Sequence, residues 1–278
     1  MGGDATRLST HRGIGTVNRI TLAPTTLPNT PPLEFIQAAV AAGFEGLGFR
    51  LHKSPAYPTW ENWLDNAPLR RAVKRALADA GQEMVESLSY YLLPDMDLDE
   101  MLPSLEYAAE LGATYALVIG RDPDWARQRD NFGRFCQAAD QYGLIAAIEA
   151  PVGTLSPLEA AFRVIEESGR ANAVVCIDPT ALLRAGDPPN APAGHDQRLL
   201  PYTQLNDGRR EGGGRVRPGD GEANLEAFLD AMPPDVPLSL EWPAPKDATY
   251  AAEEWARLAM AGTRRFLSDY AAHRAVAT

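Results

Sequence analysis

Short apolar runs alternate with longer segments of helical periodicity along almost the whole chain. The first apolar run is followed by a proline-rich loop and by a segment in which apolar residues recur on one helix face between Phe35 and Ala42, before Gly43. The same unit repeats seven more times. The apolar runs that we predict to be strands cover residues 18–22, 46–51, 84–92, 115–120, 144–150, 173–178, 201–206 and 237–242.

Amphipathic segments between these runs predict helices, and glycines that follow several of them, such as Gly81 and Gly112, are typical stop signals. The proline-rich patch 187–194 is interpreted as a loop and not as a domain boundary. After the first helix, the predicted helices cover residues 69–80, 98–111, 130–141, 157–168, 225–232 and 250–271.

Eight strand-helix units of this period predict a single-domain α/β protein, a (β/α)8 TIM barrel that spans residues 18–272 after a flexible N-terminus at 1–17. Apolar strands flanked by amphipathic helices are typical of a parallel sheet that helices cover. A doubly wound open sheet is the alternative. It is disfavoured because no GxGxxG motif follows the first strand.

Composition narrows the classes of partner. The 278 residues carry a formal net charge of -11, and no basic block is present, so we expect neither nucleic acid nor an anionic membrane as a partner. Cys136 and Cys176 form no CxxC pair, and no apolar run approaches the roughly 18 residues of a membrane helix. The first fifteen residues are polar and glycine-rich, unlike a signal peptide, so we expect a cytoplasmic protein.

Polar side chains stand at the ends of four consecutive predicted strands: Glu149, Asp178, Gln204 and Glu241. The carboxyl ends of barrel strands meet at one face, where barrel enzymes hold their active sites. An all-oxygen donor set favours a hard divalent cation such as Mg²⁺ or Mn²⁺ over structural zinc. The alternative is a salt-bridge network in which arginines neutralise these groups. The arginines considered for it are Arg50, Arg121, Arg184 and Arg217.

The stretch Pro201–Glu222 follows the seventh predicted strand and contains three glycines at 212–214 and a Pro-Gly-Asp-Gly turn at 218–221. A long glycine-rich loop after a strand that ends in polar residues is typical of the rim of a binding site, although an ordinary surface loop is the alternative. Asp207 is a less suitable ligand than Gln204, because three residues along a strand place it on the opposite face.

Three further residues have candidate roles with open alternatives. His52, just past the second strand, is either an acid/base or hydroxyl contact or a rim histidine bonded to backbone. Arg50 either binds a substrate carboxylate or phosphate or neutralises the acidic site. Trp60, with Tyr57 and Trp63, either stacks on the substrate or packs in the loop.

Six segments resemble the sugar phosphate isomerase/epimerase family with xylose isomerase-like TIM barrels, and the resemblance covers roughly residues 18–270. These segments are EGLGFRLH, IEAP, CIDPTALLRAG, YTQLND, RPGDGE and LSLEWP. The resemblance implies that Glu149, Asp178, Gln204 and Glu241 bind one divalent cation, Mn²⁺, Mg²⁺ or Co²⁺ with Zn²⁺ also possible. It also implies that Arg217 lies near the substrate. By analogy, the protein forms a homodimer or homotetramer.

Two positions depart from the pattern of that family. Many members have histidine where Gln204 stands, and many have histidine where this chain has Ala181. The resulting Glu, Asp, Gln, Glu set is similar to that of the family's dehydroshikimate dehydratases. The departures bear on the reaction and not on the binding of a metal.

The expected function is that of a metal-dependent isomerase or epimerase of carbohydrate metabolism that acts on a small sugar or keto-polyol. Glu149 and Glu241 would exchange a proton next to a carbonyl while the cation stabilises the enediolate. A lyase similar to 3-dehydroshikimate or inosose dehydratase, with a keto-acid or cyclitol substrate, is the alternative. A non-catalytic polyol-binding barrel is the alternative of another class. An endonuclease IV-like enzyme is disfavoured, because it needs a histidine-rich zinc site and a basic cleft, whereas this acidic chain has four histidines.

Overall fold

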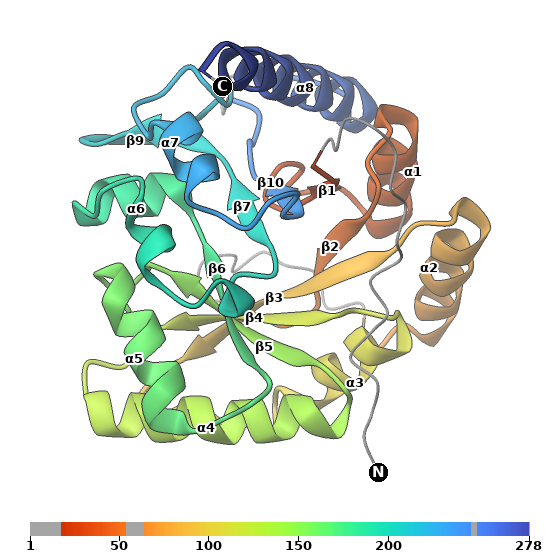
Figure 1. The fold of residues 1–278 in the computed structure, drawn as a ribbon. Coiled ribbons are helices and arrows are strands. Elements are labelled where there is room, and N and C mark those ends of the chain that lie inside the picture. The colour runs from red at the N-terminus through yellow and green to blue at the C-terminus, as the bar shows by residue number, and fades with distance from the viewer. Residues whose placement is uncertain (1–17, 54–63, 246–248, 278) are drawn as a thin grey trace.

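The computed structural model describes residues 18–53, 64–245 and 249–277 (Figure 1). The predicted flexible N-terminus at 1–17 lies outside the described residues. So does Trp60, together with its neighbours Tyr57 and Trp63.

Eight parallel strands form a nearly closed barrel, which confirms the predicted (β/α)8 fold (Figure 1). The order in the sheet is β6-β5-β4-β3-β2-β1-β10-β7. The gap between β6 and β7 is joined by a side chain, since the Thr203 hydroxyl donates to the Ile177 carbonyl at 2.8 Å. The strands are β1 (Ile20–Leu22), β2 (Leu47–Arg50), β3 (Met84–Leu92), β4 (Tyr115–Gly120), β5 (Ile145–Ala150), β6 (Ala173–Ile177), β7 (Thr203–Leu205) and β10 (Leu238–Leu240).

Helices surround the barrel, and most begin and end within a few residues of the predicted ranges. The first of them ends at Gly43, whose φ of 78° is the left-handed conformation that glycine adopts without a steric cost. The helices are α1 (Pro32–Ala42), α2 (Ala67–Ala80), α3 (Leu102–Glu110), α4 (Trp125–Gln141), α5 (Leu158–Ser168), α6 (Pro179–Ala185), α7 (Leu225–Asp230) and α8 (Ala252–Ala277), with 3-10 turns at Ala191–Gly194 and Gln197–Leu199.

Two elements differ from the sequence-based expectation. The short helix α6 follows β6 directly, where only the proline-rich loop further on was foreseen. The glycine-rich stretch after β7 is not a plain loop, because β8 (Asp207–Arg209) and β9 (Gly212–Val216) pair as an antiparallel hairpin. The chain reverses at Arg210 and Glu211, and Gly212 and Gly213 begin the returning strand with φ values of 97° and 82°, which favour glycine. The absence of apolar alternation hid both strands.

The hydrophobic core has two layers, as expected for a barrel with filled interior. The larger layer lies between the strands and the helices, and the smaller one fills the barrel. Members of the inner layer are Leu88, Leu117, Ala147, Val174, Cys176 and Tyr202.

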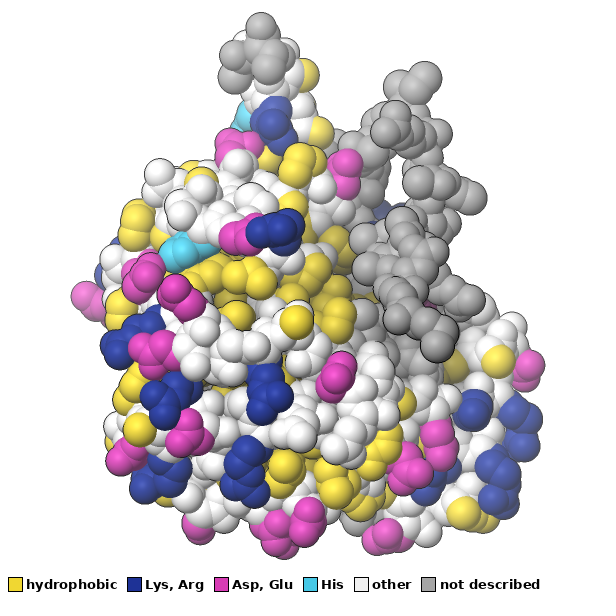
Figure 2. Space-filling model, turned by 60° about the horizontal axis from the view of Figure 1, so that its bottom comes forward, with side chains coloured by type: hydrophobic (Ala, Val, Ile, Leu, Met, Phe, Trp, Pro, Cys, Tyr) yellow, Lys and Arg dark blue, Asp and Glu magenta, His cyan; other side chains and the backbone are white. Residues whose placement is uncertain are grey.

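Charged side chains of both signs are interspersed on the face that Figure 2 shows. This pattern differs from the continuous basic stripe of a protein that follows a phosphate backbone. Over the described residues, every helix is too short or too polar to cross a lipid bilayer.

One acidic residue lies inside the barrel. Glu86 of β3 is 1% exposed, and Ser239 of β10 donates a hydrogen bond to its Oε1 at 2.5 Å. Its side chain fits because Gly48 lies opposite, where a Cβ would come within 2.7 Å of the Glu86 Cγ. Burial raises the pKa of Glu86 to about 7, and the negative charge of Glu241 adds to the shift.

We therefore expect Glu86 to make stability depend on pH. Its pKa is higher in the folded than in the unfolded state, so the folded state holds the extra proton and the free energy of unfolding falls as pH rises from about 4.5 through 7. The loss amounts to about 3 kcal/mol. Glu86→Gln should remove this slope in urea unfolding measured between pH 5 and pH 8. Glu106→Gln, on the exposed face of α3, is the control, and an unchanged slope in Glu86→Gln would contradict the prediction.

Candidate active site

The four strand-end residues come together at one end of the barrel, as their positions in neighbouring parallel strands require. Glu149 lies in β5 and Gln204 in β7, whereas Asp178 and Glu241 directly follow β6 and β10. The three carboxylates interact electrostatically, since Glu241 and Asp178 both act on the pKa of Glu149. Side chains that are separated by up to 92 positions in the sequence thus share one site.

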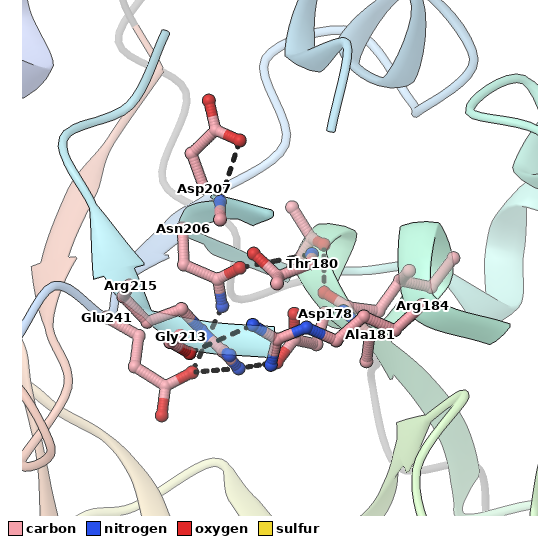
Figure 3. Close-up of polar contacts among 12 residues, drawn as sticks. Asp178, Thr180, Ala181, Arg184, Asn206, Asp207, Gly213, Arg215 and Glu241 are labelled. Atoms are coloured by element: carbon pink, nitrogen blue, oxygen red, sulfur yellow. Dashed lines mark hydrogen bonds and ion pairs between the residues drawn. The ribbon is translucent and has the colours of Figure 1, made fainter. Parts of the chain in front are cut away.

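Asp178 is the most buried of the carboxylates, with 1% of its side chain exposed. One oxygen caps α6 by accepting the Ala181 N–H at 2.8 Å, so the helix N-terminus also faces the negative charge. The other oxygen forms an ion pair with the guanidinium of Arg215 from β9. The same guanidinium lies 3.7 Å from Glu241 Oε2, so Arg215 bridges two carboxylates (Figure 3).

Two amides complete this polar group. One end of the Gln204 amide lies 3.1 Å from Glu241 Oε2 and 3.3 Å from Asp178 Oδ2. Asn206 donates to Glu241 Oε2 at 3.1 Å and accepts the Thr180 N–H of α6 at 3.2 Å. Asn206 therefore fixes the orientation of Glu241 relative to α6 (Figure 3).

Burial and mutual repulsion shift the ionisation of the acidic residues. Burial raises the pKa of Glu149 well above its usual range, and the charges of Glu241 and Asp178 raise it further against the opposing effect of Arg215. Burial likewise raises the pKa of Glu241, although Arg215 opposes the shift. For Arg215 itself, burial works against the charge, but Asp178, Glu241 and Glu149 together raise its pKa. The site therefore concentrates negative charge that a cation must offset.

The donor set fits a hard divalent cation. Among the described residues, no three His, Cys, Asp or Glu side chains lie close enough to hold an ion as they stand, and Arg215 lies between two of the carboxylates. One amide atom of Gln204 lies 3.1 Å from the carboxylate oxygen of Glu241 and 3.3 Å from that of Asp178. Adjacent ligands of an octahedral ion with bonds of about 2.1 Å are separated by about 3 Å. With its oxygen turned to the carboxylates, Gln204 would complete such a set.

The other predicted site residues lie elsewhere. Arg217 turns away from the cluster, since it forms a bidentate pair with Asp220 at 2.7 and 2.9 Å and lines a different cavity beside Gly262 and Phe266 of α8. Arg50 is 5% exposed and lines a small cavity next to Phe35 of α1.

His52 stacks on Tyr90, with ring centroids 5.6 Å apart, and burial lowers its pKa. None of the contacts described for His52 joins it to the four strand-end residues. The contacts described for Arg217 and His52 thus lie outside the cluster, Arg50 lines the cavity beside α1, and Trp60 lies outside the described residues.

The sequence-based selection missed Arg215 and Asn206. Asn206 had a detectable signal, because alternation places it on the same side as Gln204, two residues earlier. Arg215 had none, because it enters the site only through the hairpin β8–β9, which the sequence did not reveal. The family resemblance implied that an arginine of this stretch lies near the substrate, but it indicated Arg217. That residue is two positions after Arg215, where the chain has already left β9.

A buried carboxylate holds the chain that carries Arg215. Asp207 is 2% exposed, points away from the cluster in Figure 3, and accepts four backbone N–H groups. The donors are Gly208 at 2.8 Å, Gly219 at 3.0 Å, Gly221 at 2.9 Å and Ala223 at 3.1 Å. These bonds join the start of the hairpin to the turn that follows it.

A cleft of about 380 Å³ opens beside the cluster. Glu149, Asp178 and Arg215 line it, together with the segment 151–153, Ser156 and one face of α6. Its volume is at the small end of the range of about 300–1,000 Å³ for ligand sites, which suits a small molecule.

The family model that describes the xylose isomerase-like TIM barrel matches residues 36–266. The chain belongs to this family. A comparison with curated protein sequences found no match.

Solved structures share the fold at low sequence identity. The IolI protein with a bound zinc atom has a TM-score of 0.72 at 18% identity, over 91% of this chain and 99% of its own. The 3-keto-D-glucoside 4-epimerase YcjR from E. coli has a TM-score of 0.70 at 17% identity, and the match covers 90% of this chain and 100% of that protein. The probable 3-DHS dehydratase AsbF from Bacillus anthracis has a TM-score of 0.67 at 15% identity, and the match covers 87% of this chain and 97% of that protein. A fusion of a xylose isomerase-like TIM barrel with a 4-hydroxyphenylpyruvate dioxygenase has a TM-score of 0.71 at 20% identity. The match covers 91% of this chain but only 44% of the fusion protein.

We expect Asp207→Asn to destabilise the hairpin. The amide has one acceptor atom, and its NH₂ group would face backbone donors, so two or more buried N–H groups would lose their partner at a cost of about 3 kcal/mol. Thermal unfolding should show the loss, and hydrogen exchange should locate it in residues 207–223. Asp220→Asn, an exposed change in the same turn, is the control. Equal stability of both variants would contradict the proposed role of Asp207.

Proposed function

We propose that this protein is a metal-dependent isomerase or epimerase that moves a proton on the carbon next to a carbonyl of a small sugar or keto-polyol. The observation that carries the proposal is the convergence of Glu149 and Glu241 with Asp178 and Gln204 at the carboxyl end of the barrel, beside a cleft of small-molecule size. The solved structures that share the fold include an epimerase, which supports the same reaction class.

Asp178, Gln204, Glu241 and Glu149 would hold the cation, and Mn²⁺, Mg²⁺, Co²⁺ and Zn²⁺ all accept such oxygen ligands. The IolI protein, which shares the fold, holds a zinc atom, and this supports the proposal that the barrel binds a metal. When bound, the cation would acidify the carbon next to the carbonyl and offset the negative charge that develops on the substrate oxygens.

The chain's own residues supply proton transfer and orientation. Glu149 borders the cleft, and no hydrogen bond from the described residues stabilises its ionised form, which leaves an oxygen for the substrate. Glu149 would take the proton from carbon, and Glu241, which Asn206 orients, would deliver one to the opposite face or to the neighbouring carbon. Arg215 can donate to the substrate oxygens once a cation takes over its place between the carboxylates.

A lyase is the second candidate. Removal of the same proton followed by expulsion of a hydroxyl from the next carbon would dehydrate a keto-acid or cyclitol. The glutamine at 204 favours it, because that donor set is similar to the set of dehydroshikimate dehydratases, and a probable 3-DHS dehydratase is among the solved relatives.

Arg215 and the cation should compete for the same carboxylates. In Arg215→Met, Asp178 and Glu241 lose their counter-charge, so we expect the metal-free protein to melt at a lower temperature and to bind Mn²⁺ about 10-fold more tightly, a gain of about 1.4 kcal/mol. Calorimetric titration with Mn²⁺ measures the affinity. Arg217→Met is the matched control, because its guanidinium pairs with Asp220 in another cavity. An affinity for Mn²⁺ that is unchanged or weaker in Arg215→Met would show that the ion does not share this site.

In the proposed reaction, Glu149 removes a carbon-bound proton, and a carboxylic acid proton can exchange with solvent before a proton returns to carbon. We expect the Mn²⁺-loaded protein to incorporate deuterium from D₂O next to the carbonyl of at least one ketose in a panel followed by NMR. Glu149→Gln should slow this incorporation at least 100-fold, in the range of about 10²–10⁴ for general acid-base catalysis. Glu166→Gln, on the exposed side of α5, should exchange like the wild type.

Incubation with Mn²⁺ and 3-dehydroshikimate separates the two reactions, because dehydration gives an aromatic product with ultraviolet absorbance. Its formation would select the lyase. If no ketose exchanges a proton and no aromatic product forms, while ligands still bind, the barrel is a polyol-binding protein without catalytic activity.

A further inference from the structure

A second arginine lines the cleft and has no carboxylate partner among the described residues. Arg184 of α6 borders the same cavity as Glu149, Asp178 and Arg215. Its Nε donates to the Arg209 carbonyl at 3.1 Å and its Nη2 to the Gly213 carbonyl at 3.0 Å. Carbonyl oxygens orient a guanidinium but carry no net charge, so the positive charge of Arg184 is directed but not neutralised.

The wall around Arg184 leaves room for a ligand. Ala181 and Ala185 border the cleft from the same face of α6, and their short side chains do not cover the guanidinium. On the hairpin side, Gly208 allows a close approach, since a Cβ there would come within 3.6 Å of Arg184 Nη2 and 2.7 Å of the Thr180 side chain. Figure 3 shows Arg184 reaching from α6 toward the hairpin. Its remaining N–H groups are available to a molecule in the cleft.

The charges of the cleft favour an anionic ligand. Arg215 already pairs with Asp178 and lies 3.7 Å from Glu241, whereas Arg184, which is exposed to solvent, donates to two carbonyl oxygens. A divalent cation in the strand-end cluster, which is part of the function proposed above, would offset negative charge there and so make the cleft more favourable to an anion. A neutral sugar offers the Arg184 guanidinium no counter-charge, whereas a carboxylate or a phosphate does.

We propose that Arg184 anchors an anionic group, a carboxylate or a phosphate, of the small polyol that enters this cleft. The proposal deepens the proposed function and rests on the same site. The anionic group would sit at α6 and the hairpin, and the carbonyl end of the molecule would face Glu149. Arg184 thus determines the substrate class, and its bidentate donors suit both kinds of oxyanion.

Matched ligands test the proposal on the full-length, Mn²⁺-loaded protein. D-fructose is compared with D-fructose 6-phosphate, and D-glucose with D-glucuronate, so that the two pairs separate phosphate from carboxylate recognition. Calorimetry should show that at least one anion binds about 10-fold or more tightly than its neutral counterpart. In Arg184→Gln, this preference should fall by about 10- to 100-fold while the affinity for the neutral sugar stays unchanged.

Arg210→Gln is the matched control. Arg210 also ties the hairpin to α6, through a bond of 2.8 Å to the Leu183 carbonyl, but it lines a different cavity. If Arg184 served only to hold the hairpin, both variants would weaken neutral and anionic ligands alike, and the proposal would be wrong. Arg184→Lys, which keeps the charge, should retain part of the preference and replaces the glutamine variant if that one does not fold.

Binding is read without turnover, so the two proposals fail separately. Glu149→Gln should lose proton exchange yet keep the preference for the anion. Equal affinity for both members of each pair in the wild type, or no binding of either anion, would overturn the role of Arg184 even if proton exchange on a neutral ketose were observed.

Discussion

The compensation of buried negative charge is the constraint on which the site depends. Four consecutive barrel strands direct three carboxylates and an amide into one small volume, where burial removes much of their contact with water. Such a group is unstable unless a cation lies within it. Arg215 provides that cation in this structure, through contacts to Asp178 and Glu241. The same demand makes the cluster a suitable place for a divalent ion.

The charge of Arg215 reaches the cluster through a chain of local interactions. Asp207 gathers four backbone N–H groups and fixes the base of the hairpin, while Arg184 and Arg210 tie its strands to α6. Asn206 joins the end of β7 to α6 and to Glu241. The carboxylates are therefore carried by the barrel strands, whereas Arg215, which pairs with them, comes from the hairpin, and Arg184 comes from the short helix α6. A change in the hairpin would alter the electrostatics of the site without altering the barrel.

This division agrees with how barrel enzymes diversify, since strand ends hold the reacting groups and the following segments select the substrate. Here the segments after β6 and β7 bring two guanidinium groups to the cleft, and alanine stands at 181 where a larger side chain would narrow it. Gln204 adds a neutral donor among charged ones. These features together move the expected substrate away from a plain neutral sugar and toward a polyol that carries an anionic group.

The sequence by itself determined the barrel and the strand-end cluster. Both follow from short-range patterns: the apolar period fixes strands and helices, and parallel strands necessarily bring Glu149, Asp178, Gln204 and Glu241 to one end. Only the tertiary structure decided which arginine meets the carboxylates. Arg215 and Arg217 are two positions apart, and no local sequence pattern distinguishes them. The hairpin directs the Arg215 side chain to the carboxylates, whereas the ion pair with Asp220 holds Arg217 away from them. Side chains on such connections are placed by long-range contacts, which local periodicity does not encode.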